Sequence, residues 1–332
     1  MNSNKETRYD RQFLLKEWNQ DKISNAKIFI VGMGAIGIPS AVNFALMGVG
    51  TLIICDYDTI EISNLSRQLL FWEEDVGKLK SEVAAKKLKL LNPSINIISY
   101  NSKIEDLEPQ IFDDVDLMID GLDNFEARIY LNSIAVDKKK PLIHAGTFGW
   151  HGNVQVIIPF QTACMQCQPL IPESRLKKAC TPRGKMRKEE EPEEEKHFPS
   201  INTISNVISS IQSQEGIKIL LNVGKVLEEF LFYDGLTQTF TYMPLSKNID
   251  CVVCGKNRLM SKKFAIDLNE TVQQVKNRII ITYKLVDQIK ITYMGKILEE
   301  TTKLNDISIK EDDFFYVFDK SMKKPLKLQL TF

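Results

Sequence analysis

Short apolar runs alternate with stretches of helical periodicity along the first half of this 332-residue chain. Runs of about five apolar and β-branched residues, each ending at a polar or glycine-rich segment, are typical of buried strands. The strands predicted in this way are Ala26–Val31, Thr51–Cys55, Ile95–Tyr100, Val115–Ile119 and Leu142–Ala145. The helices predicted from apolar residues at helical spacing are Ile38–Met47, 78–91 and Ala127–Lys138. Because strands alternate with helices, we expect an α/β fold with a doubly wound, Rossmann-like and mostly parallel sheet.

The pattern is different on either side of this alternating region. Residues 8–26 predict a helical N-terminal arm, and Asn153–Pro159 predicts one more strand. A charged run over about 181–197 cannot bury a core, so we expect a mobile crossover segment, followed by a buried helix at Ile201–Leu221. These segments complete an expected large domain over residues 1–256.

Composition narrows the class of protein. The chain carries 43 basic and 43 acidic residues, and this balance argues against a general nucleic-acid binder, which usually has a basic excess. No apolar run approaches the roughly 20 residues of a membrane span, and the N-terminus lacks the apolar core of a signal peptide. We therefore expect a cytoplasmic protein whose partners are neither nucleic acids nor membranes.

A glycine motif follows the first predicted strand directly. Gly32 permits a tight turn, Gly34 lets the backbone approach a phosphate, and Gly37 allows close packing of helix against strand. The helix that begins there offers unpaired N–H groups to an anion. Asp56 ends the next strand, where a carboxylate can bind ribose hydroxyls. The motif therefore predicts a bound nucleotide without saying which one.

The segment from Asp56 to Gln68 favours ATP over a nicotinamide cofactor. A dehydrogenase needs no polar cluster after the ribose acid, whereas an enzyme that splits ATP between its α- and β-phosphates must neutralise charge there. Arg67 can fork to phosphate oxygens, and Lys80 can supply a point charge. Asp120 and Asp123 follow the Val115–Ile119 strand, at the sheet edge where a carboxylate can hold Mg²⁺ against ATP.

Seven ordered motifs carry a family resemblance over about residues 8–256. They are RYDRQ, GMGAIG, DYDTIEISNLSRQ, GLDN, GTFGWHGNV, TACMQC and DCVVCG. With them the chain resembles the ubiquitin-activating superfamily, which includes the ThiF-type adenylyltransferases that activate sulfur carriers for molybdopterin and thiamine synthesis. The resemblance implies ATP-dependent adenylation of the C-terminus of a ubiquitin-like protein.

The same resemblance assigns roles to individual residues. It implies that Asp56 contacts ribose and that Asp123 coordinates Mg²⁺. The residues it implies at the ATP phosphates are Asn64, Arg67, Gln68 and Lys80. Asp58, in the same segment, is a further candidate for nucleotide binding. Arg11 would be an arginine finger donated by the other subunit, which predicts a symmetric homodimer.

Cysteines indicate a metal site and a nucleophile. In a cytosolic chain, cysteines are more often ligands or nucleophiles than disulfides. Two CxxC turns supply four thiolates for a closed, structural Zn²⁺ site, formed by Cys164, Cys167, Cys251 and Cys254. Cys180 lies among lysines and an arginine that favour the thiolate, and by resemblance it would accept the modifier as a thioester. Cys55, within an apolar strand, is expected to pack in the core.

The three histidines are assigned no catalytic role. His144, His151 and His197 do not lie at metal-ligand or catalytic-triad spacing. His144 is expected to be a core or turn residue whose hydrogen-bonding groups are paired within the protein.

Residues 263–332 predict a separate small module. Strands at Phe264–Leu268, Ile289–Tyr293 and Phe314–Phe318 surround a helix near Thr271–Ile279. The segment from residue 291 to 317 resembles the second half of ubiquitin, a β-grasp fold, and the first half fits less clearly. Since the sequence ends Leu-Thr-Phe rather than Gly-Gly, we expect a ubiquitin-fold domain that recruits a conjugating enzyme, not a conjugated modifier.

Three other functions compete with a modifier-activating enzyme that forms a thioester. The first is a sulfur-carrier adenylyltransferase without a thioester step, which the C-terminal module disfavours. The second is a nicotinamide oxidoreductase, which the SNLSRQ segment and the paired CxxC turns disfavour. The third is a non-catalytic adaptor, which would have lost ATP-binding residues, whereas all of them are in place.

Overall fold

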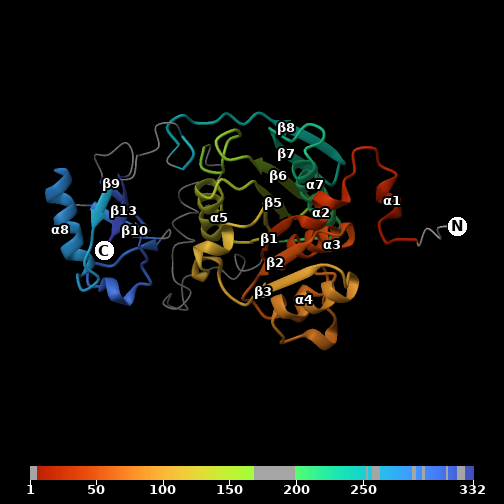
Figure 1. Ribbon diagram of the computed structural model, residues 1–332, viewed down its shortest axis with the longest axis horizontal. Helices are drawn as coiled ribbons and strands as arrows, with labels where there is room; N and C mark the ends of the chain where they lie inside the picture. The colour runs from red at the N-terminus through yellow and green to blue at the C-terminus, as the bar shows by residue number, and fades with distance from the viewer. Residues whose placement is uncertain are drawn as a thin grey trace.

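The larger unit of the protein is an eight-stranded sheet with helices on both faces (Figure 1). The computed structural model describes residues 6–167, 199–251, 253–255, 262–285, 289–293, 296–311, 313–319 and 326–332. The strands of this sheet are β1 (Lys27–Val31), β2 (Thr51–Cys55), β3 (Asn96–Tyr100), β4 (Leu117–Asp120), β5 (Leu142–Phe148), β6 (His151–Ile157), β7 (Phe230–Asp234) and β8 (Thr239–Met243).

The sheet combines a parallel half with an antiparallel half. Its strand order is β3-β2-β1-β4-β5-β6-β7-β8. Strands β1 to β5 pair in parallel, whereas β6, β7 and β8 are added as antiparallel neighbours. The chain order reverses on either side of β1, which is where an open α/β sheet places its ligand. The predicted doubly wound, mostly parallel sheet is therefore confirmed.

The two faces of the sheet bury two separate cores, because successive side chains of a strand point to opposite sides. The helices of the larger unit are α1 (Asp10–Phe13), α2 (Gln20–Asn25), α3 (Gly37–Met47), α4 (Lys80–Leu91), α5 (Phe125–Asp137) and α7 (Asn202–Leu221). On β1, Ile28 and Ile30 pack into the core under α3, α4 and α7. Phe29 and Val31 pack into the other core, under α5 and beside four cysteines. Short 3₁₀ turns connect these elements: η1 (Ile62–Asn64), η2 (Glu73–Asp75), η3 (Ile104–Asp106) and η4 (Pro109–Phe112).

Two parts of the larger unit differ from the sequence prediction. The N-terminal arm is not one helix over 8–26 but the short helices α1 and α2, because Asn19 caps a new helix by accepting a hydrogen bond from the Lys22 N–H at 2.9 Å. The strands β7 and β8 were not predicted. Every residue of β8 is exposed, so its sequence carries no run of buried apolar residues.

A second sheet of five strands forms the C-terminal unit (blue in Figure 1). Its elements are β9 (Lys262–Ala265), α8 (Val272–Tyr283), β10 (Ile289–Tyr293), β11 (Lys296–Ile297), η6 (Leu304–Asp306), β12 (Phe314–Asp319) and β13 (Leu326–Thr331). The strand order is β11-β10-β12-β13-β9. The helix begins at a capping box in which the Thr271 and Gln274 side chains bond reciprocally to backbone N–H groups. The predicted small unit with one helix is confirmed.

A further strand of this unit, β13, was not predicted. It lies between β12 and β9, antiparallel to the first and parallel to the second. Leu328 and Leu330 are fully buried against this unit's own core. Residues 326–331 are therefore an internal strand of the sheet. An ion pair between Lys310 and Glu108 joins this unit to the larger one.

Hydropathy along the helices gives no sign of a bilayer segment. Among the described residues, no helix has both the length and the apolar character that crossing a membrane would require.

Candidate active site

The site begins at a backbone contact between three glycines at the carboxyl ends of β1 and β4. Gly32 has φ +85°, a conformation that L side chains rarely adopt. A Cβ on Gly37 would lie 1.7 Å from the Gly32 carbonyl oxygen, and one on Gly121 would lie 2.7 Å from the same atom. No side chain fits at these distances. The three glycines thus let the turn after β1, the start of α3 and the loop after β4 meet in direct contact.

Gly34 differs from these glycines because no neighbouring atom requires it. The nearest atoms to a Cβ at this position are the Gln68 Nε2 and the Gly121 oxygen, both 4.0 Å away. That distance is ordinary van der Waals contact, and Gly34 does not have a positive φ. The protein itself therefore has room for a methyl group at Gly34, so the missing side chain suits a closely approaching ligand and is not required by the packing of the chain.

Asp56 ties the end of β2 to the glycine turn. One carboxylate oxygen accepts the Met33 N–H at 2.6 Å, and the other accepts the Asp58 N–H at 2.8 Å. Burial raises the pKa of Asp56, and the positive charge of Lys80 opposes that rise. The residue predicted to contact ribose therefore also fixes the shape of the turn.

Lys80 directs a buried positive charge toward the same place. It is the first residue of α4, its side chain is 10% exposed, and its Nζ lies 3.0 Å from the Asp58 Oδ2. A lysine held at the start of a helix by one partly exposed carboxylate can exchange that partner for a phosphate. The burial of Lys80 argues against a solvated lysine on a helix surface and agrees with the expectation of a role in the site.

The polar segment around η1 supplies the third side of the site. Asn64 is buried, and its Oδ1 accepts the Glu61 N–H at 3.1 Å. The Arg67 Nη1 donates to the Ser63 carbonyl oxygen at 2.7 Å. Gln68 is 3% exposed, its amide faces Gly34, and its Oε1 has no hydrogen-bond partner among the described residues. A buried amide oxygen without a partner costs about 1–3 kcal/mol, so a water or a ligand hydroxyl is expected beside it.

The two aspartates after β4 have different surroundings. Asp120 is fully buried, and its Oδ1 accepts the Leu122 N–H at 2.9 Å while its Oδ2 lies 2.6 Å from the His144 Nδ1. Asp123 is exposed and makes no hydrogen bond or ion pair with any residue that the structure describes. Asp123 is therefore the carboxylate of this loop that is not already engaged within the described residues, and its coordination of Mg²⁺ stays a prediction. The contact of His144 with Asp120 was not predicted, because parallel strand pairing brings together residues distant in sequence.

Arg11 lies apart from this group. It belongs to α1, which projects at one end of the larger unit (Figure 1). Its side chain is exposed, and within the described ranges it makes no hydrogen bond or ion pair. The neighbouring residues Phe13, Leu14 and Leu15 are each more than half exposed. The ring of Tyr9, just before α1, lies against Gly48 at the C-terminal end of α3. The glycine turn lies at the N-terminal end of that helix, so α1 does not reach the glycine turn of its own chain.

Four cysteines form a compact buried cluster on the α5 side of the sheet. Cys164, Cys167, Cys251 and Cys254 have their sulfurs within 4.8 Å of one another. Three of the Sγ–Sγ distances are 3.2, 3.6 and 3.9 Å. Sulfurs held about 2.3 Å from a tetrahedral metal ion would be separated by about 3.8 Å, whereas a disulfide needs about 2.05 Å. The donor set fits one metal ion with four protein ligands and no open position.

The structure describes only one of the other two cysteines, Cys55 and Cys180. Cys55 is 1% exposed, its thiol contacts the Ser102 carbonyl oxygen at 3.1 Å, and burial raises its pKa to about 12. The prediction of a core packing residue is therefore confirmed. Cys180, His197 and the charged run over 181–197 lie outside the described residues.

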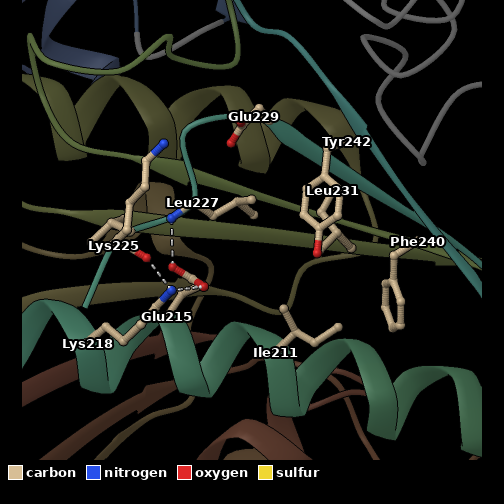
Figure 2. Close-up of a pocket in the computed structure, with 10 residues that line it drawn as sticks. Ile211, Glu215, Lys218, Lys225, Leu227, Glu229, Leu231, Phe240 and Tyr242 are labelled. Carbon is tan, nitrogen blue, oxygen red and sulfur yellow. Dashed lines mark hydrogen bonds and ion pairs between the residues drawn. The ribbon is translucent and has the colours of Figure 1, made fainter. Parts of the chain in front are cut away.

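A pocket that the sequence did not indicate lies between α7 and the strands β7 and β8, with a volume of about 480 Å³ (Figure 2). Its buried acid, Glu215, accepts the Leu227 N–H at 2.9 Å and pairs with Lys218 at 2.5 Å. Both carboxylate oxygens are thus satisfied within the chain. Phe240 and Tyr242 on β8 give the opposite wall an apolar character.

Taken together, the fold and site define a nucleotide-binding α/β protein: a glycine turn between strand and helix, an acid at the end of the next strand, and a closed thiolate cluster. The sequence matches the ThiF family over residues 9–253 and the ubiquitin family over residues 256–320. The first match covers well over half of the chain. The chain therefore belongs to the ThiF family and carries a ubiquitin-like domain after it.

Similar proteins agree with this assignment. The SAMP-activating enzyme E1 of Haloferax volcanii is 29% identical over 255 residues, which cover 75% of this chain and 88% of that protein. The adenylyltransferase and sulfurtransferase MOCS3 of Aedes aegypti is 32% identical over 269 residues, which cover 79% of this chain and 58% of that protein. Human ubiquitin-like modifier-activating enzyme 1 is 41% identical over 169 residues, covering 48% of this chain and 16% of the human protein.

Solved structures with a similar fold include MccB of E. coli. The crystal structure of E. coli MccB with ATP has a TM-score of 0.60 and 25% identity, over 77% of this chain and 76% of that one. The curated relatives are named as activating enzymes or adenylyltransferases. The chain is thus an enzyme of this ATP-using adenylyltransferase type.

Replacement of one cluster cysteine tests the metal site. We expect the purified protein to hold about one metal ion per chain, and we expect Cys251→Ser to lose it, because four thiolates complete the coordination. Since a structural metal stabilises the folded state, the variant should also melt about 10 °C or more lower. Elemental analysis and calorimetric melting measure both effects.

Cys55→Ser is the matched control, because this buried cysteine lies outside the cluster and its replacement keeps a donor for the Ser102 oxygen. It should retain the metal. Full metal content in Cys251→Ser, or a metal-free wild type, would contradict the assignment.

Proposed function

We propose that this enzyme uses ATP to adenylate the C-terminal carboxylate of a ubiquitin-like protein. The observation that carries the proposal is the group formed by Gly34, Asp56, Gln68 and Lys80 at the carboxyl edge of the parallel sheet. It offers a backbone without a side chain, an amide oxygen with no partner among the described residues, and a buried cation, which together suit the ribose and phosphates of a nucleotide. The similarity to E. coli MccB, whose crystal structure contains ATP, supports ATP as the bound nucleotide.

In this proposal the residues divide the work of one displacement. The glycine turn and the start of α3 bind phosphate oxygens. Asp56 and Asp58 bind the ribose side of the nucleotide, and Asn64 lies beside its phosphates. Arg67 and Lys80 neutralise charge on the phosphates. Asp123 holds Mg²⁺, which would neutralise further phosphate charge when bound.

The chemical step conserves every atom. A carboxylate oxygen of the modifier attacks the α-phosphorus, an O–P bond forms, and the bond between the α-phosphorus and the bridging oxygen breaks. Pyrophosphate leaves, and the acyl adenylate remains. Positioning and charge stabilisation are the contributions the protein makes to this step.

We further propose that Arg11 completes the site of a second copy in a homodimer. Arg11 is exposed and distant from its own glycine turn, and the exposed Phe13, Leu14 and Leu15 beside it offer apolar area for a subunit contact. A guanidinium donated from a partner subunit would add charge stabilisation only in the assembled enzyme.

The step after adenylation rests on two sequence features. Cys180, flanked by basic residues, is proposed to accept the acyl group from the adenylate as a thioester, with release of AMP. The ubiquitin-like domain is proposed to recruit a conjugating enzyme. Zn²⁺ is the metal proposed for the cysteine cluster, because four thiolates in a tetrahedral set favour it. The alternative, supported by the similarity to MOCS3, is adenylation of a sulfur carrier without a thioester.

Isotope exchange and gel analysis separate these readings. We expect exchange of labelled pyrophosphate into ATP that depends on a ubiquitin-like protein, and a reducible covalent adduct on non-reducing gels. Cys180→Ser should abolish the thiol-sensitive adduct and leave the exchange within about twofold, because adenylation precedes the thioester.

Each failure has its own meaning. A reducible adduct that survives in Cys180→Ser rejects Cys180 as its site, whereas exchange without any reducible adduct in the wild type favours the sulfur-carrier function. No exchange with any tested ubiquitin-like protein rejects the proposed enzyme activity.

Mixing two inactive variants tests the shared site. Arg11→Ala and Asp123→Asn should each lower the exchange rate by about a hundredfold, because each removes charge stabilisation in the transition state. After the subunits are exchanged, the mixture should recover about a quarter of wild-type activity, because half of the dimers are mixed and each has one intact site.

The wild type taken through the same exchange procedure is the control. No recovery from a mixture whose subunits have demonstrably exchanged would show that Arg11 acts within its own chain or not at all.

A further inference from the structure

His144 on β5 pairs across the sheet with Asp120 on β4. The two residues are register partners in neighbouring parallel strands, so their side chains lie on the same face. His144 is 7% exposed, and its Nδ1 lies 2.6 Å from the Asp120 Oδ2. Burial lowers the pKa of His144 despite this carboxylate, so the imidazole donates one hydrogen bond as a neutral group.

Asp120 passes this contact on to the loop that follows β4. Its second oxygen accepts the Leu122 N–H at 2.9 Å. Arg128 of α5 donates to the Leu122 carbonyl oxygen, and its Nε lies 3.6 Å from the Asp120 Oδ2. Both backbone groups of Leu122 are thus held, and its carbonyl belongs to the peptide bond that leads into Asp123.

The same loop is in contact with the glycine turn. A Cβ on Gly32 would lie 2.5 Å from the Gly121 oxygen and 3.0 Å from the Leu122 nitrogen. The loop cannot shift toward the turn without a backbone clash, so its position is set by the turn on one side and by Asp120 on the other. His144 is the donor that fixes the Asp120 side chain in this arrangement.

We propose that His144 is a positioning residue that acts through Asp120 and Leu122 to hold the Asp123 carboxylate ready for the cation of a bound nucleotide. The proposal rests on the proposed nucleotide site. A buried carboxylate that loses one donor turns toward another. The Arg128 Nε lies 3.6 Å from the same Oδ2, and Arg128 also holds the Leu122 carbonyl oxygen, so a shift of Asp120 toward Arg128 disturbs both contacts of Leu122. Loss of the His144 donor therefore moves the Leu122–Asp123 segment, as loss of an outer partner displaces a ligating carboxylate in metal sites.

Two amide variants test the position of the donor. In His144→Asn the amide nitrogen occupies about the place of Nδ1 and can still bond to Asp120. In His144→Gln the nitrogen lies near the place of Nε2, so the bond to Asp120 is lost. Both are uncharged, polar and close in size, which makes them a matched pair.

Calorimetric titration with ATP, in the absence of any modifier, supplies the readout. With Mg²⁺ present, we expect His144→Gln to bind ATP about tenfold more weakly than wild type and His144→Asn to stay within about threefold. With EDTA in place of Mg²⁺, all three proteins should bind ATP within about twofold of one another. A purely structural histidine would weaken binding equally in both conditions, or only lower the melting temperature, and either result would overturn the proposal.

A double-mutant cycle with Asp123→Asn tests the route. If His144 acts through Asp123, His144→Gln should have no further effect on Mg²⁺-dependent binding once Asp123 is replaced. An undiminished effect in that background would overturn the proposal while leaving the nucleotide site intact. Should His144→Gln fail to fold, Asp120→Asn, which weakens the same contact from the other side, replaces it in the cycle with the same expected outcome. A wild type that binds no ATP in either condition would reject the proposed function, and this inference with it.

Discussion

The close backbone packing of Gly32, Gly37 and Gly121 is the constraint on which the rest of the site depends. Three chain segments converge there: the turn after β1, the start of α3 and the loop after β4. Because a Cβ on Gly37 would lie 1.7 Å from a carbonyl oxygen, no other residue is compatible with this packing. The contact places the N-terminus of a helix and a carboxylate-bearing loop side by side. Phosphate and cation can therefore be bound by neighbouring parts of one rigid edge.

The cysteine cluster acts on a different part of the fold. It joins the segment after β6 to a segment about 85 residues later, on the face of the sheet opposite α3 and α7. Between these two segments lies the stretch that contains Cys180, which the structure does not describe. A metal ion in the cluster would fix where that stretch leaves the domain without taking part in chemistry, since all four positions would be filled. Adenylation and the proposed thioester thus depend on separate structural elements.

Much of the larger unit follows from local sequence patterns. The buried runs at β1, β2 and β4 and the glycine motif predicted the sheet and its ligand edge, because parallel strands covered on both faces are continuously apolar. The paired CxxC turns predicted the cluster for a similar reason, since their spacing alone restricts the geometry. By contrast, β8 is exposed at every residue, so no buried face marks it in the sequence. The alternation of Leu326, Leu328 and Leu330 with polar residues in β13 is a strand signal that the prediction passed over. The link of His144 to Asp120 could not be predicted from local sequence, because it exists only through strand register.

The central claim is that a nucleotide lies against the Gly34 backbone, and titration of ATP into Gly34→Ala tests it most directly. The added methyl group has its nearest protein atoms at 4.0 Å, so the variant should fold and melt as the wild type does. A nucleotide held against this backbone would be displaced, and we expect ATP affinity to fall at least tenfold, about 1.4 kcal/mol. Ser66→Ala, on the exposed side of the same region, should bind as the wild type does. Unchanged affinity in a correctly folded Gly34→Ala protein would contradict the account.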